Sequence, residues 1–377
     1  MQEQRIITHE GLEVRISATA NEDILSILNQ AVQGSERGMR FRLQNIPARI
    51  EAYEDQIRFV SLYKKNRIAG TVGSCYRMTG QGKLEYPSCY LRYLAFQTAY
   101  RSESDRKKRT KEIIKPDTGD MSFKERTLEI FSKPHLLGFR NVKETDKHIM
   151  YAFIESMNER SKHLVHQAGY EYIRSFLTVA FSRFNPKPDS RVVKLNSVAE
   201  KKVMETQLKD FYRDYSFFNT DHCFYGDNYY VLKEGGEIIA GVNALPSVYK
   251  IYDIPGVWGW VMMNVLPKSP YYKKLFHPDE FRHLIFDALY CQKGCEEVLP
   301  DLFETACYME GFNTGLLWLD DHSELYDTLR TSMRMGAINR ILNAKPGLVY
   351  ARFVNMTDQE KECFYDAPAY ISGFDFS

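Results

Sequence analysis

Residues 94–109 read LAFQTAYRSESDRKKR, an apolar stretch followed by a polar turn and a run of positive charge. The apolar part ends the phrase SCYLRYLAF (88–96), whose near-continuous apolarity predicts a strand buried on both faces. The basic side chains beyond it are Arg101, Arg106, Lys107, Lys108, Arg109 and Lys111. Three interpretations of this run stay open: a solvated loop, a contact with the phosphate groups of a cofactor, and a contact with nucleic acid.

The composition bounds the class of protein. The chain has 377 residues, 44% of them hydrophobic and 14% aromatic, which is enough for two domains with cores of their own. The formal net charge is +1, so the chain as a whole does not have the charge of a nucleic-acid binder. We find no signal peptide and no apolar run long enough to span a membrane, and therefore expect a cytoplasmic protein without membrane contact.

Cysteine and histidine spacing gives no sign of a metal site. The seven cysteines are scattered and odd in number, which favours reduced and mostly buried thiols. His163 and His166 share one helical face, but no third ligand accompanies them, so a surface pair is expected. Cys295 has no histidine placed beside it and does not read as a nucleophile.

The order of predicted elements recurs along the chain. The first half reads as a hairpin over 57–78 that turns at Lys65-Asn66, then the strand 88–96, a helix from Ser122 and a strand–helix–strand unit over 148–182. The polar, proline-containing stretch FNPKPDS (184–190) follows as a linker. We expect domains at 1–185 and 191–377, joined at 186–190.

The second half reads as a strand, an amphipathic helix and a hairpin turning at Gly235-Gly236. Strands are predicted at VWGWVMMNVL (257–266), at HLIFDALYC (283–291) and at FNTGLLWLD (312–320), with a helix over 295–311 between the last two. A helix from His322 and two strands, AINRILN (337–343) and GLVYARFV (347–354), close the unit. We expect Trp258 and Trp260, on either side of Gly259, to pack in a core or an interface and not to form a platform for a substrate.

Two phrases of the first half resemble the GNAT superfamily of acetyl-CoA-dependent N-acetyltransferases. LAFQTAYR (94–101) is similar to the end of the family's fourth strand, which leads into a phosphate-binding loop R-x-x-G-x-G. IESMNERS (154–161), followed by Gly169-Tyr170, is similar to the family's strand–helix phrase in which Asn opens a helix. The resemblance implies an α/β (α+β) protein of two tandem GNAT-like domains, each a mixed twisted sheet flanked by helices, and acetyl-CoA or another acyl-CoA as cofactor.

The resemblance also implies site residues in the first half. Cofactor contacts are expected at Phe96, Arg101, Ser102, Ser104, Arg106, Asn158 and Ser161, because glycine-rich turns and helix N-termini hold phosphates. Glu155 is the candidate base at the end of its strand. The sequence departs from the family where Ser104 and Arg106 replace glycines and where Val165 replaces a Tyr that acts as an acid, and an insertion is expected over 102–120.

The second half resembles the family less closely. Gln292, Lys293 and Gly294 are similar to the phosphate-binding loop, although Glu296 and Glu297 compete with an anion for the start of the following helix. Tyr326 falls where the family places its acid. The sequence therefore predicts an acyl-CoA-dependent N-acyltransferase with a small-molecule or peptide amine as acceptor. A GNAT-like scaffold without catalysis, and a transferase that uses aminoacyl-tRNA, are the alternatives.

Overall fold

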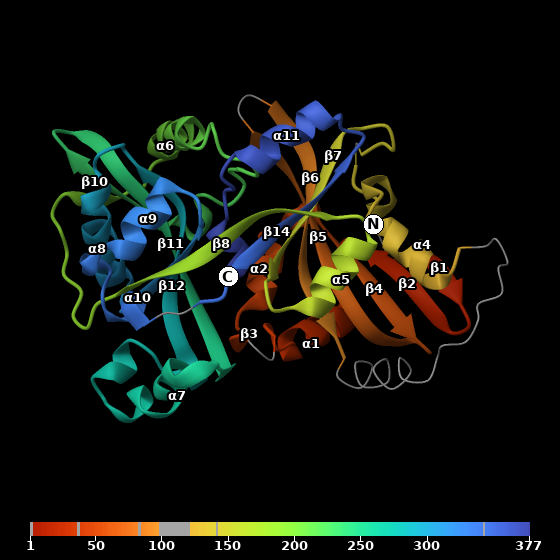
Figure 1. Ribbon diagram of the computed structural model, residues 1–377, viewed down its shortest axis with the longest axis horizontal. Coiled ribbons are helices and arrows are strands. Elements are labelled where there is room, and N and C mark those ends of the chain that lie inside the picture. Colours follow the sequence, from red (N-terminus) through yellow and green to blue (C-terminus); the bar gives the residue numbers. More distant parts are fainter. Residues whose placement is uncertain (1–2, 36–37, 82–83, 98–120, 141, 342–343) are drawn as a thin grey trace.

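The computed structural model describes residues 3–35, 38–81, 84–97, 121–140, 142–341 and 344–377. Its strands form one mixed sheet in the order β1-β2-β4-β5-β6-β7-β14-β8-β13-β12-β11-β10-β9, with β3 paired to β11 beside this path (Figure 1). The sheet runs without a break from the first half of the chain to the second. Among the described helices, none is long and apolar enough to cross a membrane.

The strands of the first half are β1 (Gln4–His9), β2 (Leu12–Ser17), β3 (Arg40–Leu43), β4 (Ile57–Lys64), β5 (Arg67–Gln81), β6 (Leu84–Phe96), β7 (His148–Glu155) and β8 (Glu171–Ser182). Those of the second half are β9 (Val192–Lys194), β10 (Tyr229–Glu234), β11 (Glu237–Asp253), β12 (Phe281–Cys291), β13 (Thr314–Asp320) and β14 (Gly347–Val354). The helices are α1 (Glu22–Gln30), α2 (Ile46–Glu51), α4 (Phe123–Ile130), α5 (Glu159–Gln167), α6 (Val198–Phe211), α7 (Gly256–Asn264), α8 (Leu299–Glu310), α9 (Glu324–Thr331), α10 (Ala337–Ile341) and α11 (Asp358–Asp366).

Both predicted hairpins form at the predicted turns. Lys65 and Asn66 join β4 to β5 with φ of 48° and 61°, and Gly235 and Gly236 join β10 to β11 with φ of 58° and 91°. Two successive residues with positive φ are what a two-residue hairpin turn needs to match the twist of its strands. These turns fix the register of the first two strands in each repeat.

The recurring order predicted from the sequence is present, but the two repeats exchange a strand. The series β4-β5-β6-β7-α5-β8 corresponds to β10-β11-β12-β13-α9-β14. The last strand of each series does not close its own unit. Instead β14 pairs with β7, β8 pairs with β13, and β8 and β14 pair with each other at the centre. The domain ranges 1–185 and 191–377 stay a prediction, and the sheet crosses both of them.

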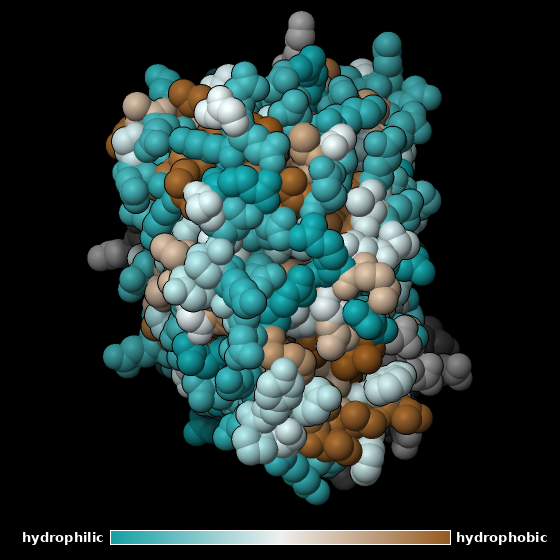
Figure 2. All heavy atoms as spheres, turned by 90° about the vertical axis from the view of Figure 1, so that its left-hand side faces the viewer, coloured by the Kyte–Doolittle hydropathy of each residue, from teal (hydrophilic) through white to brown (hydrophobic). Residues whose placement is uncertain are grey.

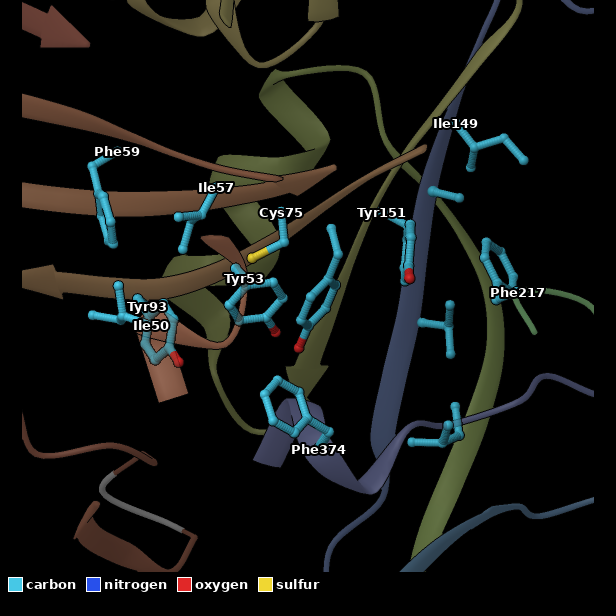
Figure 3. Packing of buried hydrophobic residues seen from close by; sticks show 14 of the residues in the cluster. Ile50, Tyr53, Ile57, Phe59, Cys75, Tyr93, Ile149, Tyr151, Phe217 and Phe374 are labelled. Carbon is cyan, nitrogen blue, oxygen red and sulfur yellow. The ribbon is translucent and has the colours of Figure 1, made fainter. Parts of the chain in front are cut away.

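The main hydrophobic core draws on both halves. It joins Tyr53 and Cys75 of the first half to Phe374, which follows α11 in the second half (Figure 3). Ile285 of β12 and Val349 of β14 belong to the same core. In the first half α1 and α2 cover this face of the sheet, and α4 and α5 pack on the opposite face. In the second half α8 and α9 cover one face and α6 packs over the other.

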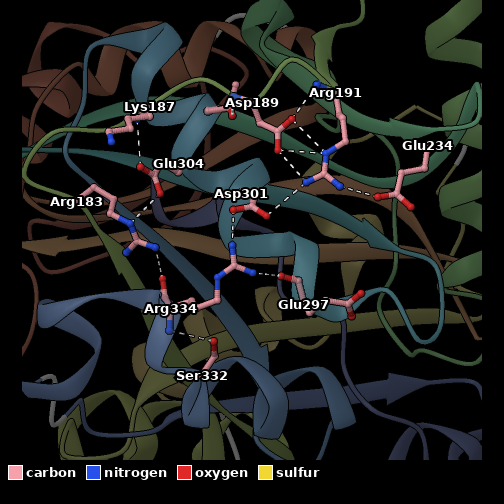
Figure 4. A network of polar contacts seen from close by, with 11 residues as sticks. Arg183, Lys187, Asp189, Arg191, Glu234, Glu297, Asp301, Glu304, Ser332 and Arg334 are labelled. Carbon is pink, nitrogen blue, oxygen red and sulfur yellow. Dashed lines mark hydrogen bonds and ion pairs between the residues drawn. The ribbon is translucent and has the colours of Figure 1, made fainter.

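The predicted linker is held against the second half by charged groups (Figure 4). Arg183 forms an ion pair with Glu304 of α8 at 2.8 Å, and the Lys187 amide donates to the same carboxylate. Arg191 pairs with Asp189 at 2.8 Å and with Glu234 at 2.6 Å. Arg334 pairs with Asp301 of α8 in the same network. The segment therefore has a fixed path although it contains neither helix nor strand.

Two predicted strands are wrong. Most of VWGWVMMNVL lies in helix α7, and AINRILN contains helix α10. Helix α10 is held by tertiary contacts with β8: the Ser182 hydroxyl accepts from the Ile338 amide at 3.1 Å, and the Asn339 side-chain oxygen accepts from the Ala180 amide at 3.1 Å. Short apolar runs do not distinguish strand from helix by period, so contacts of this kind decide the outcome.

Candidate functional site

A pair of parallel strands diverges in the middle of each half. In the first half β6 and β7 pair from Ser88 with Ile149 to Leu91 with Ala152, and then separate. Beyond that point β6 stays with β5 up to Phe96, whereas β7 follows β14 up to Glu155. Within the described residues, the last part of β6 thus has no strand partner on the side facing β7.

A β-bulge lies at the same place in each half, where the parallel strands separate. In β6 it falls at Tyr93, which has a φ of 59° and follows Arg92. In β12 it falls at Ala288, which has a φ of 47° and follows Asp287. A positive φ is costly for a residue with a side chain and is concentrated at functional positions. The two bulges therefore lie at equivalent positions of the two repeats. We call the strand ends around Tyr93 and around Ala288 the two half-sites.

Glu155, the candidate base, ends β7 on the diverging side. Its backbone pairs with Gly347 of β14, and its carboxylate lies against Gly38, where an added Cβ would be 1.5 Å from the Glu155 Oε1 atom. Burial raises the pKa of Glu155, and the nearby Ser35 opposes this only in part. The Oε2 atom is buried and has no hydrogen-bond partner among the described residues. A half-buried carboxylate with a raised pKa has the properties of a general base.

The other first-half candidates have different environments. Asn158 is the N-cap of α5, and its side-chain oxygen accepts from the Ser161 amide at 3.1 Å. The ring of Phe96 lies over Gly70, where an added Cβ would be 2.4 Å from it. Val165 is buried in the core on the α5 face and supplies no acid. Arg101, Ser102, Ser104, Arg106 and the expected insertion over 102–120 lie outside the described residues, so they stay predictions.

The equivalent opening in the second half is filled. Between β12 and β13, which pair only at Leu284 with Gly315 and at Ile285 with Leu316, there is a cavity of about 20 Å³, enough for about one water molecule. Its lining includes Asp287, Trp318 and Asp320 from these strands together with Tyr212 and Tyr370. An acyl-CoA arm does not fit in such a volume.

The loop candidates of the second half are engaged with their own chain. The Gly294 amide donates to the carboxylate of Glu296 at 3.0 Å, and the Gln292 amide donates to the Ile239 carbonyl at 2.8 Å. Glu296 thus occupies the Gly294 amide, a donor that a phosphate would need. This agrees with the expectation that Glu296 competes with an anion at this position. Lys293 is exposed. Tyr326 packs in the core of the second half and does not line the cavity between β12 and β13.

The C-terminal segment, residues 369–377, connects the two half-sites. Asp287 accepts hydrogen bonds from the amides of Gly373 and Phe374 at 2.8 and 3.0 Å. Arg92, at the other bulge, donates to the Ser377 carbonyl and to the hydroxyl of Tyr53. The residue before each bulge therefore binds the same nine-residue segment.

Buried ion pairs fix the segment and the exchanged strands. Arg77 of β5 makes two hydrogen bonds to Asp375, at 3.0 and 2.9 Å, and both side chains are 1% exposed. Arg174 of β8 makes two hydrogen bonds to Asp320 of β13, at 3.0 and 2.9 Å, and the same carboxylate accepts from the Ala369 amide. Within the described residues no group of three or more His, Cys, Asp or Glu side chains has the arrangement of a metal site.

Comparison of the sequence with known proteins finds no matching family model and no curated relative. Comparison of the structure does find solved proteins with the same arrangement. Saccharomyces cerevisiae N-myristoyltransferase with bound myristoyl-CoA has a TM-score of 0.54 and 10% identity, over 92% of this chain and 84% of that chain. A second structure of that enzyme, with bound myristoyl-CoA and inhibitors, has a TM-score of 0.53 over 97% of this chain and 87% of that chain.

This chain has the N-myristoyltransferase fold. The predicted fold, an α/β arrangement of two tandem GNAT-like units, is confirmed. A GCN5-related N-acetyltransferase from Anabaena variabilis is a weaker structural match, with a TM-score of 0.46 and 11% identity over 91% of this chain and 73% of that chain. At such identities the likeness concerns the fold, so the chemistry has to be argued from the residues of this chain.

Sequence reasoning missed the residues that organise the N-myristoyltransferase fold here. Arg92 and Asp287 lie in apolar strands, where nothing in the pattern separates them from other half-buried polar residues. Tyr93, at the bulge of β6, has a buried hydroxyl without a partner among the described residues, and burial raises its pKa. The one available signal was a charged residue at the same place in both repeats, which becomes visible only when the repeats are aligned through their hairpins.

Proposed function

We propose that this protein transfers an acyl group from an acyl-CoA to an amine, and that the acyl-CoA lies along the diverging end of β6. The observation that carries this proposal is the bulge at Tyr93 beside an unpaired strand edge. Beyond Leu91 no described strand pairs with β6 on the β7 side, and the amide-bearing arm of a CoA thioester can pair with such an edge as an added strand would. The fold, common to enzymes solved with myristoyl-CoA, supports the assignment.

We place the acyl-CoA site in the first half and not in the second for two reasons. The cavity between β12 and β13 holds about one water molecule, and the Gly294 amide is already bonded to Glu296. In addition, the basic residues after Phe96, with Arg101 first among them, stand in the sequence where the phosphates of the cofactor would be. The second half then serves the acceptor or the fold and not the cofactor.

Glu155 is the proposed general base. The thioester supplies an activated carbonyl carbon and a thiolate leaving group. The amine nitrogen forms a bond to that carbon, the carbon–sulfur bond breaks, and Glu155 takes the proton that the nitrogen loses. Because burial raises the pKa of Glu155, it is better matched than an exposed carboxylate to accept a proton near neutral pH.

Calorimetric titration with acetyl-CoA and with longer acyl-CoAs tests the cofactor assignment. We expect saturable binding with a Kd below about 1 mM, the weakest range that a specific site supports. Arg101→Gln should weaken this binding, whereas Lys293→Gln, its counterpart in the second half, should leave it unchanged. Absence of binding for every acyl-CoA at millimolar concentration contradicts the proposal, and the opposite ranking of the two variants moves the site to the second half.

The role of Glu155 is tested with a panel of amines and mass-spectrometric detection of free CoA and acylated product. Glu155→Gln should keep the acyl-CoA affinity and lower the turnover about 10²- to 10⁴-fold, and the acid limb of the pH–rate profile should disappear. Glu159→Gln is the matched control, since Glu159 is exposed four residues further on and pairs with Lys162. Equal activity of the two variants contradicts the assignment.

One observation favours a second candidate function, a binding scaffold without catalysis. Val165 occupies the position at which the family places an acid, and it is fully enclosed in the core. A scaffold would bind acyl-CoA in the titration but release no CoA with any amine tested. The same two measurements therefore separate the enzyme from the scaffold.

A further inference from the structure

The connection between β11 and β12, residues 254–280, carries an unusual amount of exposed apolar surface. Seven of the large hydrophobic side chains that are exposed in the described chain fall within 252–272: Tyr252, Val257, Trp258, Trp260, Val265, Tyr271 and Tyr272. Figure 1 shows α7 projecting from the lower end of the second half, and Figure 2 shows hydrophobic residues gathered at that end of the molecule. A patch of this kind marks a contact with another body.

Helix α7 is apolar around its circumference, although only one side of it is covered. Its sequence is GVWGWVMMN, and its contact with the protein is made through the buried Gly259 and Met262. Gly259 is required there because an added Cβ would lie 2.0 Å from the Ile254 carbonyl oxygen. The opposite side presents Val257 and Trp260, which are 80% and 61% exposed, and Trp258 at its flank is 56% exposed. A helix that is apolar all round is expected to be buried, and within the described chain nothing buries this side.

A basic pocket lies at the base of the same connection. It has a volume of about 240 Å³, and it is lined by the basic residues Lys273, Lys274, His277 and Arg282 with a single carboxylate, Glu280. Within the described residues, no carboxylate forms an ion pair with Lys273, Lys274 or Arg282. Arg282 lies 5.1 Å from the ring centre of Phe312, which orients its guanidinium. Unpaired cations around a hollow are complementary to an anion such as a phosphate group.

From these two features we propose that residues 254–282 dock this protein on the surface of a membrane that contains anionic phospholipids. Tryptophan and tyrosine side chains favour the boundary between headgroups and acyl chains, and lysines beside them interact with anionic headgroups. The apolar outer side of α7 would enter the headgroup boundary, while the pocket would receive a phosphate. The sequence led us to expect no membrane contact because it contains no span, but a peripheral contact of this kind needs none.

Vesicle flotation with the full chain tests the proposal, using phosphatidylcholine vesicles with and without 30 mol% phosphatidylglycerol, a fraction of about one third. We expect binding to the anionic vesicles, with a blue shift of tryptophan emission, and release on raising the salt concentration. Trp258→Ser/Trp260→Ser should lower the partition coefficient on the order of tenfold or more. Lys273→Gln/Lys274→Gln should lower it on the order of tenfold and abolish the preference for anionic lipid.

Two matched controls keep the result specific. Val198→Ser/Val203→Ser removes exposed apolar side chains from α6, which are 84% and 58% exposed, and Lys143→Gln/Lys202→Gln removes exposed cations elsewhere. Both should float like the unmodified chain. The proposal is overturned if the unmodified chain does not float, or if the controls lose binding as the α7 variants do. It is also overturned if sedimentation shows that Trp258→Ser/Trp260→Ser separates a dimer, since the patch would then join two copies. Acyl-CoA binding enters none of these measurements.

Discussion

At the scale of single residues, the buried pair Arg77 and Asp375 is the most demanding feature of the molecule. Two charges with 1% exposure each are tolerated because the bidentate geometry and the Tyr53 hydroxyl, 3.2 Å from the carboxylate, replace water. Asp375 also ties the C-terminal segment to β5. The pair therefore specifies where the end of the chain lies more than it stabilises the fold.

Asp375→Asn should lower the free energy of unfolding by about 3–5 kcal/mol, because it leaves the guanidinium of Arg77 buried without its counter-ion. The measurement is denaturation in urea. Arg77→Met/Asp375→Leu should recover most of the loss, since no charge then remains buried. Asp358→Asn, which removes a fully exposed partner of Lys361, should cause no measurable change. Equal losses for Asp375→Asn and Asp358→Asn would contradict the buried-pair argument.

His283 gives the stability of the protein a pH dependence. Burial between Tyr249 and Phe281 lowers the pKa of His283 to about 4, and its Nδ1 atom is 3.1 Å from the Phe281 carbonyl. The unfolded chain binds a proton at this side chain below about pH 6.5, whereas the folded chain does not, so stability falls as the pH drops from 6.5 to 4.

For His283 alone the loss is about 2 kcal/mol at pH 5 relative to pH 7. His283→Phe should therefore show a stability–pH curve that is flatter than that of the unmodified chain by this amount between pH 7 and pH 5. His163→Asn is the control, since His163 is exposed on α5. Denaturant titrations at several pH values provide the comparison, and parallel curves for unmodified chain and His283→Phe would refute it.

At the scale of elements, the exchange of β8 and β14 rests on close packing at the centre of the sheet. Gly347 begins β14 opposite Glu155 on one side and Phe176 on the other. A Cβ at position 347 would lie 2.1 Å from the Phe176 ring. Position 347 therefore needs glycine because the Phe176 ring packs directly on it, and not because its backbone adopts a conformation that favours glycine.

Gly347→Ala should destabilise the protein by about 1–3 kcal/mol through overpacking. Phe176→Leu removes the ring atoms that the new methyl group meets, so Gly347→Ala/Phe176→Leu should lose less than the sum of the two single losses. Thermal and urea unfolding of the four chains measure this coupling. If the losses of the two single variants simply add in the double variant, positions 347 and 176 are not coupled through packing.

The incorrectly predicted elements, α7 and α10, share one cause. Both stretches are short, and neither α7 nor α10 has a side-chain N-cap that its sequence would announce. For α7 the helix depends on Gly259 fitting against Ile254, and for α10 on Asn339 bonding the Ala180 amide. The correctly predicted helices α5 and α9 instead carry local caps at Asn158 and Ser323, residue types that favour the start of a helix.

At the scale of the whole molecule, the exchanged strands and the C-terminal segment make the two repeats interdependent. Residues 1–185 expressed alone lack β14, which separates β7 from β8, and lack the segment that completes the main core. We expect this fragment to show no cooperative unfolding transition by circular dichroism, whereas the full chain should show one. Adding residues 186–377 should restore it. Cooperative unfolding of the fragment by itself would mean that the predicted domains are independent.

The sequence by itself determined the elements with local signals and the repeat of their order. The hairpins at Lys65-Asn66 and Gly235-Gly236 and the capped helices α5 and α9 depend on neighbouring residues only, and these predictions hold. Only the tertiary structure decided which strand stands beside which, and that the last residues of the chain connect the two bulges. Those outcomes depend on contacts such as Arg77 with Asp375, separated by 298 positions, and no local pattern encodes a partner so distant.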